Sequence, residues 1–71
     1  NSYAVYSLKG DALSNLGRYR EAIDCYNQAL KLEPNSHSIW LQLGLILSTL
    51  ERHEEAIESF DRVIQLKPDS Y

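Results

Sequence analysis

The chain has 71 residues, which is enough for one small domain with a limited hydrophobic core. Hydrophobic residues make up 44% of the chain and charged residues 24%, as in an ordinary folded soluble protein. The net charge of −3 makes nucleic acid an unfavourable partner. With a single cysteine, Cys25, the chain cannot form an internal disulfide bond, which favours a reducing compartment such as the cytoplasm.

The first predicted element is a helix over about 3–16, followed by a second over about 19–32. In the first, apolar and small residues recur at helical spacing up to Leu16, and Gly17 is suited to end the helix. The second has an apolar stripe, an acidic residue (Glu21) in its first turn and Lys31 in its last. Pro34 ends it, and the side chains of Asn35 and Ser36 are suited to cap the next helix.

The third predicted helix, over about 37–50, is apolar nearly all round and stands at the middle of the chain. Such a helix needs neighbours on more than one side. We therefore expect it to pack between the helices before and after it. It is too short and too polar to cross a bilayer, and so no membrane is expected as a partner. The fourth helix is predicted over about 53–66.

Residues 3–36 and 37–70 are two copies of one unit. Laid over each other without a gap, they share eleven identities in 34 positions. These are Gly10/Gly44, Leu13/Leu47, Ser14/Ser48, Leu16/Leu50, Arg18/Arg52, Glu21/Glu55, Ala22/Ala56, Ile23/Ile57, Leu32/Leu66, Pro34/Pro68 and Ser36/Ser70.

Small residues in each copy predict a close approach of its two helices. They are Gly10 and Ala22 in the first copy and Gly44 and Ala56 in the second. The large residues expected to fill the core beside them are Tyr6, Tyr26, Trp40 and Phe60. Connections this short predict that successive helices are antiparallel.

The repeated unit resembles the tetratricopeptide repeat (TPR), which has a 34-residue period. The residues that carry the resemblance in the second copy are Trp40, Leu43, Gly44, Leu47, Ala56, Phe60, Val63 and Pro68, and in the first Tyr6, Gly10, Leu13, Ala22, Tyr26, Ala29 and Pro34. Lys9 and Glu51 depart from the family pattern, which favours leucine and glycine there, and Leu13 and Leu47 stand where it favours tyrosine. Glu51 predicts either a left-handed backbone or a turn unlike the one at Gly17.

The resemblance implies an all-α fold of two tandem helix–turn–helix units, with four antiparallel helices in a right-handed solenoid. It also implies a concave groove, lined by the first helix of each unit, that binds a peptide or helix of a partner. The groove residues carried over are Ser7, Asp11, Asn15, Ser38, Leu41, Gln42, Leu45, Ser48 and Thr49, with Ala4, Leu8 and Ser14 beside them.

The predicted groove set contains neither Lys nor Arg, and Asp11 would repel an acidic tail. A clamp for a partner's terminal carboxylate is therefore disfavoured. Leu41 and Leu45 lie one helical turn apart, where they either anchor an apolar ligand side chain or only pack within the stack.

The register of the repeats predicts that 1–71 is one TPR fragment of a longer array. Asn1 and Ser2 match the end of each unit, and Tyr71 matches Tyr3 at the start of one. An array needs a terminal helix with a polar outer face, and none is predicted after Leu66. We expect self-association through an apolar patch on the last helix, formed by Ile57, Phe60 and Ile64.

No catalytic, cofactor-binding or metal-binding residue is predicted. His37 and His53 are too far apart along the sequence for one metal ion, and Cys25 has no histidine partner. The acidic run over 51–61 is interpreted as a solvated face, with Glu58 pairing with Arg62.

The sequence thus favours a non-enzymatic protein-interaction scaffold over two alternatives. One is a solenoid that only spaces or assembles other domains. The other is a helical repeat that binds single-stranded RNA, which the acidic balance disfavours.

Overall fold

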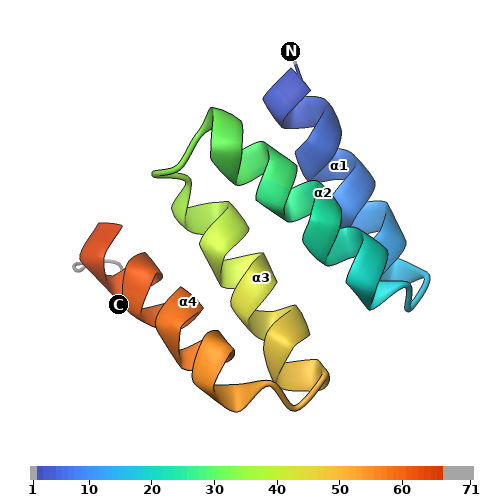
Figure 1. Cartoon of the computed structure of the whole chain (residues 1–71). Coiled ribbons are helices and arrows are strands. Elements are labelled where there is room, and N and C mark those ends of the chain that lie inside the picture. Colours follow the sequence, from blue (N-terminus) through green and yellow to red (C-terminus); the bar gives the residue numbers. More distant parts are fainter. Residues whose placement is uncertain (1, 67–71) are drawn as a thin grey trace. The chain divides into compact units, whose positions relative to one another are not determined.

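The computed structural model describes residues 2–66, and within that range it contains four helices and no strand (Figure 1). They are α1 (Ser2–Asn15), α2 (Tyr19–Leu32), α3 (His37–Thr49) and α4 (His53–Leu66). The predicted all-α class with two helix–turn–helix units is confirmed. The expected helix stop at Pro68 and the matching end residues Asn1, Asp69, Ser70 and Tyr71 lie outside the described residues.

The chain divides into two compact units, Asn1–Pro34 and Asn35–Tyr71. In the first, α1 packs along α2, and in the second α3 packs along α4, each pair running antiparallel across a short turn (Figure 1). None of the four helices is long and apolar enough to serve as a membrane span.

In each unit the two helices meet where a glycine of the first helix faces an aromatic ring of the second. A Cβ added to Gly10 would lie 2.6 Å from Cε1 of Tyr26, and a Cβ on Gly44 would lie 2.6 Å from Cε1 of Phe60. Any side chain at either glycine would therefore push the ring away. The predicted close approach at these two positions is confirmed.

The four aromatic residues expected in the core are not equally buried. Tyr26 is fully buried, and the other fully buried large side chain in the described part is Ile39. Tyr6, Trp40 and Phe60 are only half-buried. Leu16, which continues the apolar spacing of α1, is also mostly exposed, because it lies past the last turn that faces α2. Phe60 thus packs beside Gly44 as predicted but is not fully enclosed, and Tyr6 and Trp40 are less buried than a core position implies.

The two turns inside the units have the same geometry although their residues differ. Arg18 N–H donates to the Leu13 carbonyl (2.9 Å) and Gly17 N–H to that of Ser14 (3.0 Å). The equivalent bonds run from Arg52 to Leu47 (2.8 Å) and from Glu51 to Ser48 (2.9 Å). These are the two hydrogen bonds of a Schellman motif, which needs a left-handed residue after the helix.

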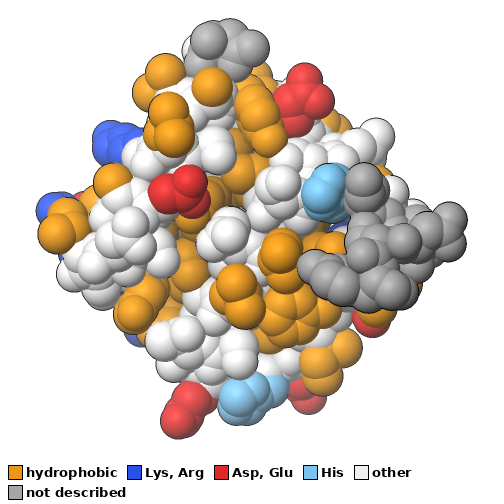
Figure 2. Space-filling view, turned by 180° about the vertical axis from the view of Figure 1, so that it is seen from behind, with side chains coloured by type: hydrophobic (Ala, Val, Ile, Leu, Met, Phe, Trp, Pro, Cys, Tyr) orange, Lys and Arg blue, Asp and Glu red, His pale blue; other side chains and the backbone are white. Residues whose placement is uncertain are grey.

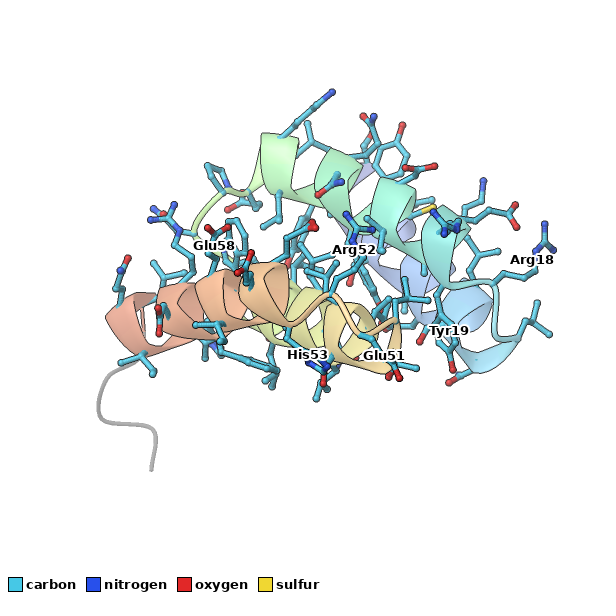
Figure 3. The ribbon with its side chains drawn as sticks, turned by 60° about the horizontal axis from the view of Figure 1, so that its bottom comes forward. Arg18, Tyr19, Glu51, Arg52, His53 and Glu58 are labelled. Carbon is cyan, nitrogen blue, oxygen red and sulfur yellow. The ribbon has the colours of Figure 1, made fainter. Side chains whose placement is uncertain are left out.

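That left-handed position is Gly17 (φ 77°) in the first unit and Glu51 (φ 63°) in the second. Of the two alternatives open for Glu51, the left-handed backbone is confirmed. Figure 3 shows Glu51, Arg52 and His53 in the second turn, with Arg18 and Tyr19 in the first.

The predicted N-cap of α3 is correct in position but wrong in its side-chain contact. Ser36 occupies the N-cap with an extended backbone and accepts the first helical hydrogen bond, from Trp40 N–H, at its carbonyl. Its hydroxyl makes no capping hydrogen bond. Ser36 thus begins the helix through its extended backbone and its carbonyl rather than through a side-chain cap.

Candidate protein-binding surface

The predicted groove residues of the first unit lie along one side of α1. Ser7, Asp11 and Asn15 are four residues apart, and this spacing places them above one another on a helix. Asp11 and Asn15 are exposed and Ser7 is partly so.

The predicted groove residues of the second unit lie along α3. Ser38, Gln42, Ser48 and Thr49 are exposed, Leu45 is 49% exposed and Leu41 is half-buried. The result is a strip with two leucines among hydroxyl and amide groups. We call the nine predicted residues of α1 and α3 the first-helix strip.

Asp11 faces solvent, and its carboxylate is also hydrogen-bonded to a residue of α2. The hydroxyl of Tyr26 donates a hydrogen bond to Oδ1 of Asp11, across the two helices of the unit. Burial, followed by this hydrogen bond and the negative charge of Asp11, raises the pKa of the Tyr26 phenol well above its ordinary value. Because one carboxylate oxygen already accepts this bond, Asp11 has less capacity for a ligand than an isolated surface aspartate.

The hydroxyl of Thr49 is also engaged within its helix. Its Oγ1 donates to the backbone carbonyl of Leu45 at 3.0 Å, the usual back-bond of a helical threonine. Thr49 therefore offers a ligand an acceptor oxygen and a methyl group rather than a donor.

The first-helix strip has no basic side chain, and the molecular surface agrees with this. Figure 2 shows side chains on one face, where few of those drawn belong to Lys or Arg. Phosphate backbones require a continuous basic area for non-specific binding. The strip as built suits a neutral or mixed ligand.

A second exposed apolar stripe runs along α1 and into the turn after it, and of its members only Leu8 was expected beside the groove. Val5, Leu8 and Leu16 are all more exposed than Leu45, and with Ala12 they recur at spacings of three, four and four. Residues at these spacings lie on one side of a helix. The sequence pattern does not single this stripe out, because the residues that face α2 follow a parallel pattern one or two positions away.

The predicted self-association patch is partly altered by the structure. Ile57 and Ile64 are 58% and 60% exposed on α4. Phe60, between them in sequence, is half-buried because its ring packs on Gly44. The exposed patch therefore consists of the two isoleucines, and Phe60 belongs to the helix–helix contact of its own unit.

The same ion pair stands at the start of the second helix in each unit. Arg18 binds both carboxylate oxygens of Glu21 (2.6 and 2.7 Å), and Arg52 binds both of Glu55 (2.9 and 2.6 Å). The hydrogen bond from Arg18 lowers the pKa of the Glu21 carboxyl. Both pairs are about half exposed, so each contributes little to stability.

The expected pairing of Glu58 with Arg62 is wrong. It is absent from the ion pairs of residues 2–66, and the guanidinium of Arg62 instead lies 5.2 Å from the centre of the Trp40 ring. A cation over an aromatic face competes well with an exposed i,i+4 ion pair.

No group of three or more potential metal ligands occurs in the described part of the chain. His53 is exposed, His37 is half-buried, and Cys25 is a free, buried cysteine of α2. Cys25 is thus a packing residue of the first unit.

Comparison with known proteins agrees with this architecture. A family model described as a tetratricopeptide repeat matches residues 7–71. The chain belongs to the tetratricopeptide repeat family. TPR proteins of this kind serve in general as protein-interaction scaffolds and are typically non-catalytic. No curated protein matches the sequence.

Two solved structures are similar to this TPR chain. A crystal structure of MamA has a TM-score of 0.92 and 26% identity, covering 96% of this chain and 41% of that one. An arginine-to-glutamate mutant of MamA has a TM-score of 0.88 and 38% identity, covering 90% of this chain and 47% of that one. The chain therefore spans less than half the length of these structures.

Proposed function

We propose that this chain is a protein-binding segment of a TPR array, and that a peptide or helix of a partner lies along the first-helix strip. The observation that carries the proposal is accessibility. Seven of the nine strip residues are exposed, and Ser7 and Leu41 are partly so. Leu41 and Leu45 supply an apolar anchor among polar groups, which is the composition of peptide-recognition surfaces.

The proposal is tested by selecting binders from a library of short random peptides and measuring their affinity for variants. Leu45→Glu and Leu41→Glu should each weaken a selected peptide by about tenfold or more, because a charge replaces the apolar anchor. Ile64→Glu is the matched control, since it makes the same kind of change on α4.

Selected peptides that bind the Leu41 and Leu45 variants unchanged would contradict the proposal. If those peptides were instead weakened by Val5→Glu, the binding surface would be the neighbouring apolar stripe on α1. Failure to select any peptide would favour a solenoid that only spaces other domains.

A second role, self-association, is supported by a different observation. Apolar side chains are exposed in two separate places: Val5 and Leu8 on α1 with Leu16 in the turn after it, and Ile57 and Ile64 on α4. We infer that copies of this chain associate through these faces, which bury apolar area that each copy leaves exposed.

A further inference from the structure

A depression lies between α3 and α4, on a surface that neither proposed role uses. Its volume is about 490 Å³. Its lining comes from both helices of the second unit: Trp40, Leu43, Leu47, Glu55, Glu58, Ser59, Asp61, Arg62 and Gln65.

The apolar side of the depression is supplied by α3. Trp40, Leu43 and Leu47 follow one another at spacings of three and four, and so they form a short stripe. Trp40 is half-buried, and the guanidinium of Arg62 lies 5.2 Å from the centre of its ring. The ring face therefore already accepts a cation supplied by the chain itself.

The opposite side, supplied by α4, carries the carboxylates of Glu55, Glu58 and Asp61 but only one cation, the guanidinium of Arg62. Glu55 is neutralised by Arg52, which binds both of its oxygens. Glu58 and Asp61 take part in no ion pair within residues 2–66. Two exposed carboxylates beside an aromatic face form a site with an excess of negative charge.

Arg62 is weakly held over the ring. Its side chain is exposed, and its other described contact is a long hydrogen bond from Nη1 to Oε1 of Gln65 at 3.4 Å. A bond of that length contributes little. Moving Arg62 into water therefore costs little beyond its contact with the ring.

The first unit offers an internal comparison, because the equivalent surface is built from different residues. Lys9 replaces Leu43, and Tyr6 and Gln28 replace Trp40 and Arg62. Lys9 lies close enough that its charge adds to the hydrogen bond from Arg18 in lowering the pKa of Glu21. A cation of the chain thus approaches this surface in both units, although from different helices.

We propose that the α3–α4 depression binds a basic side chain, arginine or lysine, of a partner protein. The incoming cation displaces Arg62 from the face of Trp40 and lies between the ring and the carboxylates of Glu58 and Asp61. Charge complementarity argues for this occupant, since the depression has negative charge in excess and an aromatic face exposed to cations. This proposal does not depend on peptide binding by the first-helix strip, which is formed by other side chains.

The sole tryptophan of the chain is Trp40, so its fluorescence reports on this depression. We would titrate the protein with a short glycine-serine peptide that contains one arginine, and with the same peptide containing citrulline, which is neutral. The arginine peptide should change Trp40 emission in a saturable way, and the citrulline peptide should not. Circular dichroism of each variant checks that the helices are intact.

Substitutions of the lining residues should shift this affinity in opposite directions. Glu58→Gln and Asp61→Asn should each weaken the arginine peptide by about threefold. Arg62→Gln should strengthen it by about threefold, because the internal competitor is removed. Asp24→Asn, which removes a carboxylate at the equivalent position of the first unit, should leave the affinity unchanged.

Three results would overturn the proposal. They are equal responses to the arginine and citrulline peptides, an unchanged or weaker affinity in Arg62→Gln, and a loss in Asp24→Asn as large as that in Glu58→Gln. The last result would mean that the peptide responds only to the net charge of the chain.

Discussion

Glu51 is the residue whose backbone is least suited to its side chain. It holds the left-handed position of a Schellman turn that Gly17 fills in the other unit, with the same two hydrogen bonds. A residue with a Cβ costs about 1 kcal/mol there relative to glycine. The turn keeps its geometry because the hydrogen bonds and the packing of α3 on α4 outweigh that cost.

Glu51→Gly should therefore raise the free energy of unfolding by up to about 1 kcal/mol, less the entropy that glycine adds to the unfolded chain. The reverse change at the equivalent site, Gly17→Glu, should lower it by about the same amount. Chemical denaturation followed by circular dichroism measures both. A Glu51→Gly protein that is less stable than the parent would show that the side chain makes a compensating contact.

The two buried glycines face rings with different freedom to move. Gly10→Ala and Gly44→Ala each gain about 1 kcal/mol of helix propensity, and each brings a Cβ to 2.6 Å from a ring carbon. Tyr26 is fully buried and cannot retreat, whereas Phe60 is half-buried and can.

Gly10→Ala should accordingly lose about 1–2 kcal/mol net, because the overpacking exceeds the propensity gain. Gly44→Ala should stay within about 1 kcal/mol of the parent. Denaturant midpoints at equal m-values give the comparison. Equal losses at the two sites would mean that ring mobility does not decide the outcome.

At the scale of helices, α1 and α2 are joined by the hydrogen bond from Tyr26 to Asp11, and this bond makes stability depend on pH. The pKa of Tyr26 is raised in the folded state, chiefly by burial. The neutral phenol of Tyr26 therefore contributes its full stabilisation at pH values below about 10, the pKa of tyrosine in the unfolded chain. This contribution is lost as the pH rises above that value.

We expect the free energy of unfolding to fall as the pH rises above about 10, with a slope that approaches one proton, and Tyr26→Phe to remove that slope. At pH 7 the same variant should cost about 0.5–1.5 kcal/mol, the value of one hydrogen bond. Denaturation curves at a series of pH values test this. An unchanged slope in Tyr26→Phe would assign the alkaline loss to other groups.

The second unit lacks both partners of this hydrogen bond. At the positions equivalent to Asp11 and Tyr26 it has Leu45 and Phe60. Because the glycine–ring contact is the same in both units, the bond should be transferable. Combining Leu45→Asp with Phe60→Tyr should give a favourable coupling of about 0.5–1 kcal/mol in a double-mutant cycle. A coupling of zero would mean that the para position of the Phe60 ring does not face α3 in the way that the Tyr26 hydroxyl faces α1.

For the molecule as a whole, self-association through exposed apolar helix faces has a direct test. Ile57→Glu with Ile64→Glu should shift the protein towards monomer in sedimentation equilibrium, because two charges replace apolar contacts. Leu45→Glu with Leu41→Glu carries the same added charge on α3 and should leave the association unchanged. A parent protein that stays monomeric at high concentration would contradict the proposed self-association.

Much of the architecture was predictable because the 34-residue period repeats the residues that cause it. The glycines facing the rings and the residues of the shared Arg–Glu pairs recur in register. The sequence pattern alone could not predict how deeply each side chain is buried. Half-exposure of Trp40 and the position of Arg62 over its ring depend on side-chain geometry, and so the ion pair expected from i,i+4 spacing did not form.

The hydrogen bond between Asp11 and Tyr26 constrains how a binding surface of this kind can evolve. A carboxylate on the outside of a helix is usually free to change with the ligand. Here the Asp11 carboxylate also accepts the hydrogen bond of the buried Tyr26 hydroxyl. A substitution of Asp11 on the outside of α1 therefore leaves an interior hydroxyl without its acceptor, and a second substitution at Tyr26 would remove that cost.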